Sequence, residues 1–178
     1  MNYNELSEEE QIKLVLENGY ILQLIRHPSE AVRLAAVQQD GHAIKYIETP
    51  SEIDQLAAVQ RNGYAIKHIN NPTEVVQLTA IQNNGIAIRY IKNPSEAIQL
   101  AAVSRIGYAI QHIECPSEVV QLTAVQEYWG SIRYINNPSG VVQLAAVQQN
   151  PYSINYIQNP SDELRAYAEL LQLTRRTK

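Results

Sequence analysis

Cysteine is almost missing from this chain of 178 residues, in which Cys115 is the only one. A single thiol excludes an intrachain disulfide framework and any zinc or iron–sulfur site built from cysteines. Long apolar runs are also missing, because none approaches the roughly 18 residues that a membrane-spanning helix needs. The first residues lack the basic and apolar parts of a signal peptide. We therefore expect a soluble, cytoplasmic protein that does not contact a membrane.

Positive charge is scarce as well. The chain has 14 Lys and Arg against 18 Asp and Glu, which gives a formal net charge of −4. That balance argues against a protein that binds DNA by bulk charge, although it allows a local basic strip. Apolar residues make up 45% of the chain, enough to bury a substantial core.

Proline is sparse but regular, since seven of the eight prolines recur every 22 residues. These are Pro28, Pro50, Pro72, Pro94, Pro116, Pro138 and Pro160. Glycine keeps the same spacing at Gly19, Gly41, Gly63, Gly85 and Gly107. A fixed period in this range indicates a stack of similar repeats.

The repeat from Pro72 to Asn93 predicts an α-helix of about 12 residues, a turn and a shorter second helix. We expect Asn71 to be the N-cap, Pro72 the first helical residue and Glu74 part of the first turn. The glycine that follows the long helix predicts a helix end with glycine in the left-handed conformation.

The apolar residues of the long helix spread around most of its circumference, so the helix must be covered on several sides. A stack of near copies supplies that cover. We therefore predict one all-α solenoid domain over residues 1–178. It comprises an N-terminal capping repeat (1–27), six 22-residue repeats (28–159) and a C-terminal capping helix (160–178). Ser7 and Glu10 read as a capping box that opens the first helix.

The pattern P-S-E-x-V-Q-L-A-A-V-Q-x-N-G-x-A-I-x-Y-I resembles two groups of α-repeats. One is the leucine-rich-variant repeat. The other is an uncharacterised bacterial and viral repeat family, whose segments are similar to residues 56–66 of this chain. The resemblance implies a right-handed solenoid in which each α-helix pairs with a 3₁₀-helix. It supplies no catalytic residue, and its viral members suggest a role in phage–host conflict.

Histidine is the obvious candidate for metal binding or acid–base catalysis, and the chain has His27, His42, His68 and His112. The last two occupy the same position two repeats apart, roughly 20 Å at ordinary helix spacing, so they cannot share a metal. No phosphate-binding glycine loop or hydrolase motif is present, and Cys115 reads as an inert thiol. We expect no enzyme, no metal site and no cofactor.

Aromatic residues recur in the short second helix. Tyr or His stands near its end at Tyr46, His68, Tyr90, His112, Tyr134 and Tyr156. Four residues earlier stand His42, Tyr64, Ile86, Tyr108 and Tyr152, which predicts ring pairs such as Tyr64/His68 and Tyr108/His112 on one helix face. The residues just before the first set are Lys45, Lys67, Arg89, Gln111, Arg133 and Asn155. Stacking would give a Tyr/His seam beside a partly basic strip, used either for packing between repeats or for binding.

Glutamine recurs at two positions of the long helix. One set is Gln55, Gln77, Gln99, Gln121 and Gln143, and the other is Gln38, Gln60, Gln82, Gln126 and Gln148. Both fall inside otherwise apolar arcs, so we expect a ladder of amides that bonds one repeat to the next. A polar lining that binds the backbone of an extended ligand is the alternative.

Departures from the repeat pattern mark candidate functional positions. Trp129 replaces the turn glycine, which is displaced to Gly130, so Tyr128 and Trp129 form either a partner anchor or a gap-filling corner. Asp54 stands where other repeats have Val or Ile, and we expect Arg33 of the preceding repeat to neutralise it. Other departures are Ile106, Gly140 and Pro151.

We expect a non-enzymatic scaffold that binds a protein or peptide through a repeat-built surface. The residues expected to carry binding are Tyr128, Trp129, Tyr134, Tyr64, His68, Tyr90, Tyr108 and His112. The alternative is an anion, nucleotide or nucleic-acid binder that uses Lys45, Lys67, Arg89 and Arg133. A spacer in an assembly, without any ligand, is a third interpretation.

Overall fold

The computed structural model describes residues 2–176, and these form helices and loops without a β-strand. The α-helices are α1 (Glu8–Glu17), α2 (Glu30–Gln39), α3 (Glu52–Arg61), α4 (Glu74–Asn83), α5 (Glu96–Arg105), α6 (Glu118–Glu127), α7 (Gly140–Gln149) and α8 (Asp162–Arg176). The 3₁₀-helices are η1 (Tyr3–Glu5), η2 (Gly19–Leu24), η3 (Gly41–Tyr46), η4 (Gly63–His68), η5 (Gly85–Tyr90), η6 (Gly107–His112), η7 (Trp129–Tyr134) and η8 (Pro151–Tyr156). Residues 1 and 177–178, which the predicted terminal caps include, lie outside the described residues.

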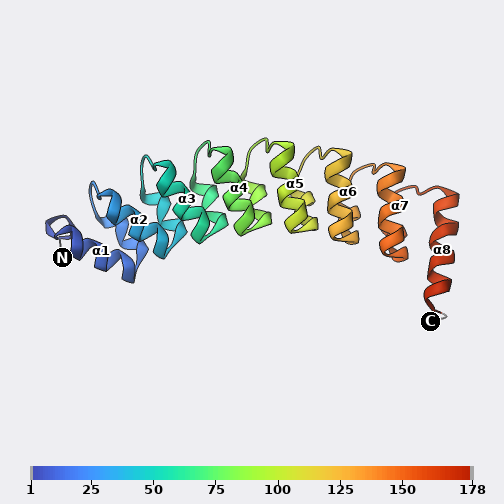
Figure 1. Ribbon diagram of the computed structural model, residues 1–178, viewed down its shortest axis with the longest axis horizontal. Helices are drawn as coiled ribbons and strands as arrows, with labels where there is room; N and C mark the ends of the chain where they lie inside the picture. The colour runs from blue at the N-terminus through green and yellow to red at the C-terminus, as the bar shows by residue number, and fades with distance from the viewer. Residues whose placement is uncertain (1, 177–178) are drawn as a thin grey trace. The chain divides into compact units, whose positions relative to one another are not determined.

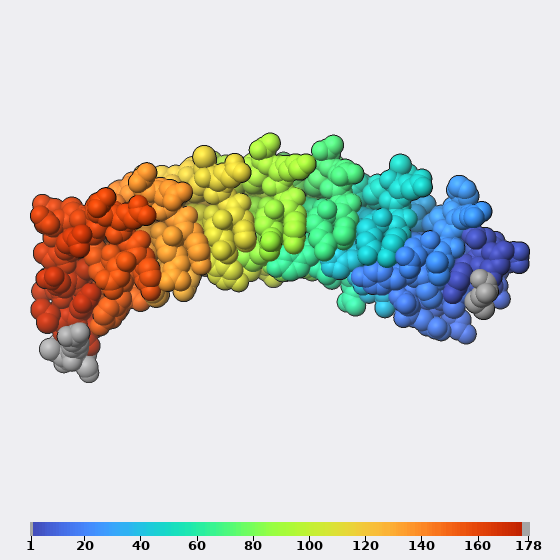
Figure 2. All heavy atoms as spheres, turned by 180° about the vertical axis from the view of Figure 1, so that it is seen from behind, coloured from blue at the N-terminus to red at the C-terminus, as the bar shows by residue number. Residues whose placement is uncertain are grey.

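Each 22-residue repeat pairs an α-helix of 10 residues with a 3₁₀-helix of six (Figure 1). The chain divides into two compact units, unit 1 (Met1–Lys92) and unit 2 (Asn93–Lys178). Within each unit consecutive α-helices pack on one another, and the repeats follow in chain order as adjacent bands (Figure 2). The predicted all-α solenoid of 22-residue repeats is therefore confirmed, and its second helix is a 3₁₀-helix.

From α2 to α7 the N-cap is the residue after proline, which corrects the predicted cap. In α4 the N-cap is Thr73, whose hydroxyl accepts the N–H of Val76, and Glu74 is the first helical residue. The predicted cap, Asn71, lies two residues earlier in the chain. Serine and threonine are strong N-caps, and they occupy this position throughout. The capping box of Ser7 and Glu10 forms as predicted.

In most repeats the residue before proline does not cap the helix but forms a turn with left-handed backbone. Its φ lies between 49° and 52°, in the left-handed region, at His27, Asn71, Asn93, Asn137 and Asn159. Asparagine tolerates this conformation better than most residues. A following proline also disfavours the right-handed helical region for the residue before it. The recurrent asparagine therefore makes the turn that leads into the next repeat.

The turn glycines are not in the left-handed conformation, which corrects a second expectation. Asn62 ends α3 with extended backbone, and its side chain accepts the N–H of Tyr64 at 3.0 Å to start η4. A Cβ on Gly41 would lie 2.4 Å from the carbonyl oxygen of Ala58 in the following repeat. At this position glycine is required because η3 touches the backbone of α3.

Small and branched apolar side chains fill the space between repeats. In α2, Val32, Ala36 and Val37 are completely buried, and Ala43 and Ile44 of η3 are buried with them. Equivalent residues are buried in the other repeats of both units. Removing these surfaces from water is the main favourable term in the stability of such a stack.

The recurrent glutamines do not form the expected ladder between repeats. Gln77 donates its side-chain N–H to the carbonyl of Pro72, in its own repeat, at 2.9 Å. The same bond joins Gln55 to Pro50, Gln99 to Pro94, Gln121 to Pro116 and Gln143 to Pro138. The second set, Gln38, Gln60, Gln82, Gln126 and Gln148, is exposed. The first set thus closes the loop of its own repeat, and the second lies outside the apolar arc.

Two other side-chain positions bond one repeat to the next. At the end of α4, Asn83 donates to the carbonyl of Gln60 at 2.9 Å, and at the start of α3, Glu52 accepts from the hydroxyl of Thr73 at 2.7 Å. The first kind of bond also joins Arg61 to Gln39 and Gln149 to Gln126, and the second also joins Ser29 to Glu8 and Ser117 to Glu96. Polar bonding between repeats therefore lies at the two ends of the α-helices.

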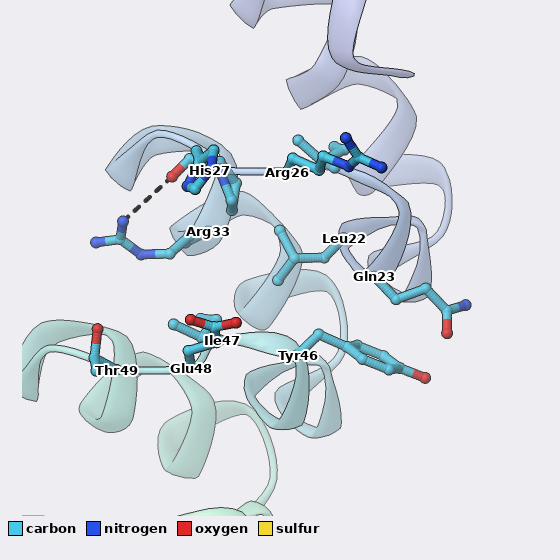
Figure 3. Close-up of a pocket in the computed structure, with 11 residues that line it drawn as sticks. Leu22, Gln23, Arg26, His27, Arg33, Tyr46, Ile47, Glu48 and Thr49 are labelled. Atoms are coloured by element: carbon cyan, nitrogen blue, oxygen red, sulfur yellow. Dashed lines mark hydrogen bonds between the residues drawn. The ribbon is translucent and has the colours of Figure 1, made fainter. Parts of the chain in front are cut away.

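Asp54 is completely buried, at a position that other repeats fill with Val or Ile. Its Oδ2 lies 3.1 Å from Nε of Arg33, which confirms the predicted partner, and it also accepts the backbone N–H of Ser51 at 3.0 Å. Arg33 donates in addition to the carbonyl of Pro28 at 3.3 Å (Figure 3). Arg33 thus replaces the glutamine of the other repeats and also neutralises a buried charge.

We predict that Gly41→Ala lowers the free energy of unfolding by about 2 kcal/mol, because the new methyl group clashes with the backbone of α3. Gly140→Ala is the matched control, since a Cβ there meets nothing within 4 Å. At this helical position it should stabilise by about 0.5 kcal/mol or more. Urea unfolding of both variants tests the assignment, and equal effects would contradict it.

We predict that Arg33→Gln lowers the free energy of unfolding by about 3 kcal/mol, because it leaves the buried Asp54 without a cation. The double variant Arg33→Gln/Asp54→Val restores the ordinary repeat and should match or exceed the stability of the native chain. Chemical denaturation of the single and double variants measures both values. A double variant no more stable than Arg33→Gln would refute this account.

Candidate binding surfaces on the short helices

The rings of the Tyr/His seam contact each other between neighbouring repeats. Tyr20 lies edge-on to Tyr46 with ring centroids 5.9 Å apart, and Tyr64 lies edge-on to Tyr90 at the same distance. The sequence pattern predicted that Tyr64 pairs with His68. In the structure Tyr64 pairs instead with Tyr90 of the next repeat. The physical reason is the 3₁₀-helix, whose three residues per turn do not align residues four apart.

Two cations of the basic strip, Lys45 and Arg89, lie over rings of the seam. Nζ of Lys45 is 4.9 Å from the ring centre of Tyr20 and 4.8 Å from that of Tyr46. Arg89 lies 5.2 Å from the ring of its neighbour Tyr90. A cation over an exposed ring is held by about 0.5–1 kcal/mol. Within unit 1, Lys45 and Arg89 therefore lie beside the rings of the seam.

Packing and exposure coexist in the seam. Tyr90, which contacts Tyr64, keeps 38% of its surface in solvent, and Tyr134 keeps 40%. Tyr46, Tyr64, His68 and His112 are half-buried. The two interpretations offered by the sequence, packing and binding, therefore do not exclude each other.

A hollow of about 560 Å³ in unit 2 collects several of the predicted site residues. Its lining includes Tyr108, Tyr128 and Tyr134, which are 43%, 44% and 40% exposed. Its other lining residues are Arg105, Ile106, Gly107, Gln111, Glu127 and Arg133. The lining groups Tyr108 with two rings of the next repeat, Tyr128 and Tyr134.

Two departures from the repeat pattern create the hollow. Ile106 and Tyr128 stand where other repeats have an asparagine or aspartate that caps the 3₁₀-helix, and neither makes a capping bond. Tyr128 instead lays its ring over Gly130, where a Cβ would lie 2.5 Å from the ring. The displaced glycine is therefore what allows Tyr128 to adopt this position.

Trp129 is the centre of an aromatic cluster at the η7–η8 contact. Its ring centroid lies 5.7 Å from that of Tyr128 and 6.1 Å from that of Tyr156. Arg133 covers the Tyr156 ring at 4.4 Å. Trp129 is half-buried while Tyr128 is exposed, so the tryptophan fills the junction and the tyrosine extends from it.

Two further hollows lie at the loops between repeats, and sequence reasoning missed them. One, of about 540 Å³, is lined by residues including Arg26, His27, Arg33 and Glu48 (Figure 3). The other, of about 410 Å³, lies at the equivalent place two repeats later, with Asn71 in the position of His27. The left-handed residue before proline shapes both, and its periodic asparagine is the signal that could have revealed them.

His42 and His68 form a ring pair in unit 1, with centroids 5.4 Å apart. Nε2 of His42 lies 3.1 Å from the side-chain nitrogen of Asn62, and its Nδ1 is buried without a partner among the described residues. Burial lowers the pKa of both imidazoles, and Lys67 lowers both further, while Asp40 opposes the shift at His42. Both rings therefore favour the neutral form.

The other candidates for reactive chemistry stay apart. Cys115 is exposed and has a free thiol. No group of three or more His, Cys, Asp or Glu side chains that could hold a metal ion occurs in the part of the chain that the structure describes. Within the same residues, no helix combines the length and apolar character needed to cross a bilayer.

Comparison of the chain with protein-family models, with curated proteins and with solved structures finds no match. The resemblance to leucine-rich-variant and viral α-repeats therefore stays a prediction that rests on packing and turn residues.

We predict that the chain loses stability as the pH falls from about 7.5 to about 5.5. The pKa values of His42 and His68 are lower in the folded chain, so the unfolded chain binds more protons over this range. His42→Tyr/His68→Tyr should lose less, because it copies the Tyr20/Tyr46 and Tyr64/Tyr90 pairs. Urea midpoints at both pH values test this, and an equal loss in both proteins would contradict it.

Proposed function

We propose that this chain is a non-enzymatic scaffold that binds a protein or peptide through the surface of its short helices. The observation that carries the proposal is the unit 2 hollow, where Tyr108, Tyr128 and Tyr134 are each at least 40% exposed. Tyrosine, tryptophan and arginine are enriched at protein interfaces, and they supply most binding hot spots.

The origin of the hollow supports this function further. Two residues that line the hollow, Ile106 and Tyr128, occupy capping positions of 3₁₀-helices. Neither makes the capping hydrogen bond that the other repeats make. Packing of a repeat does not require these side chains, because the asparagine-capped repeats stack in the same way. The half-buried Trp129 holds Tyr128 from behind, so the exposed ring is presented on a fixed support.

A nucleic-acid or nucleotide binder that uses Lys45, Lys67, Arg89 and Arg133 stays the second prediction from the sequence. The geometry supports it less, because base stacking needs free ring faces. Lys45 covers the faces of Tyr20 and Tyr46, and Arg133 covers the face of Tyr156.

Peptides selected from a random display library on the native chain provide the test. We expect Tyr134→Ala and Trp129→Ala to weaken a selected peptide by about tenfold or more, the loss typical of an interface hot spot. Val119→Ala is the matched control, since Val119 is 58% exposed on α6, outside the hollow. Fluorescence anisotropy gives the affinities, and circular dichroism confirms that the variants fold. Unchanged affinity in both aromatic variants would overturn the assignment of the hollow.

A further inference from the structure

The six-residue short helices of unit 1, η2 to η5, carry only positive charge. Residues 19–24, 41–46, 63–68 and 85–90 contain Lys45, Lys67 and Arg89 but no Asp or Glu, although acidic residues outnumber Lys and Arg over residues 1–92. All three cations are exposed, and none forms a salt bridge with a described carboxylate. Because η3, η4 and η5 pack consecutively, these cations lie in neighbouring repeats.

The strip is positioned to meet carboxylates rather than bases. Lys45 lies between Tyr20 and Tyr46, and Arg89 lies over Tyr90. The protein's own cations therefore cover faces of these rings. Asp40, which precedes η3, uses its carboxylate to accept the backbone N–H of His42 at 2.9 Å. Fixed cations with free N–H donors suit charge-assisted bonds to acidic side chains.

A titratable pair interrupts the strip. His42 and His68 take the place that tyrosine pairs hold in the adjacent repeats, and their rings are 5.4 Å apart. The charged groups that act on them are Lys45, Lys67 and Asp40. Protonation of either ring would add positive charge between Lys45 and Lys67, where a bound anion offsets the repulsion.

We propose that Lys45, Lys67 and Arg89 bind an acidic peptide segment, and that the His42/His68 pair strengthens this binding as the pH falls. The proposal shares with the proposed function the assignment of binding to the short helices, but it rests on unit 1 and on different residues. An acidic segment is favoured over a nucleic acid because the covered ring faces offer no platform for bases.

The first experiment measures binding of a fluorescein-labelled peptide of alternating Glu and Ser. About ten residues suffice, because an extended chain of that length spans three repeats about 10 Å apart. We expect binding at low salt, and a loss of about tenfold or more in Lys45→Glu/Lys67→Glu. Lys13→Glu/Arg165→Glu is the matched control, because it changes the net charge equally at exposed sites on α1 and α8. An equal loss in both double variants would overturn the proposal.

The second experiment repeats the titration at lower pH. From about pH 7.5 to about pH 5.5 we expect the native chain to bind about fivefold more tightly, and His42→Tyr/His68→Tyr to show no gain. The probe cannot cause a gain, since protonation of its own carboxylates weakens binding. A gain of the same size in the tyrosine variant would overturn the assignment of the histidine pair.

An oligothymidylate of the same charge separates the two classes of ligand. Binding of the oligonucleotide without binding of the acidic peptide would overturn the proposal in favour of a nucleic-acid partner. That failure is distinct from failure of the proposed function, whose test depends on Trp129 and Tyr134 of unit 2.

Discussion

The close approach of the short helices to the backbone of the following repeat, at Gly19, Gly41, Gly63 and Gly107, is the constraint on which the other features depend. A Cβ at Gly41 would lie 2.4 Å from the carbonyl oxygen of Ala58, so the repeats are as near as two backbones allow. At this separation, side chains of successive repeats must touch. The contacts of Tyr20 with Tyr46 and of His42 with His68 follow directly. The candidate binding surface is therefore a product of the same packing that holds each unit together.

Much of the fold could be predicted because its signals are periodic or local. The recurrence of proline and glycine specified the repeat, and the buried position of Asp54 pointed to Arg33. The helix start could not be read correctly, because asparagine and threonine are both good caps and only the backbone shows that Asn71 is left-handed. The hydrogen bonds from glutamine to the proline carbonyl were not predicted for a related reason. Helical angles alone do not show that a loop carbonyl such as that of Pro72 lies within reach.

Three of the predicted binding residues, Tyr108, Tyr128 and Tyr134, line the unit 2 hollow, but the contacts between rings were not predicted. The seam and the strip followed from the period, whereas the partners of each ring depend on the winding of a 3₁₀-helix. The unit 2 hollow forms where Ile106 and Tyr128 break the pattern. Such breaks identify a position without giving its shape, because the shape also depends on the neighbouring repeat and on Gly130.

The ion pair of Arg33 and Asp54 bears on how an array of this kind can evolve. Tandem segments of uniform length gain and lose copies by unequal recombination, and a crossover between equivalent positions preserves the stacking pattern. In the two copies that carry Arg33 in place of glutamine and Asp54 in place of Val or Ile, a crossover between the copies would instead separate a carboxylate from its cation. Because such a separation is strongly destabilising inside a protein, we expect these two modules to be retained together and in this order.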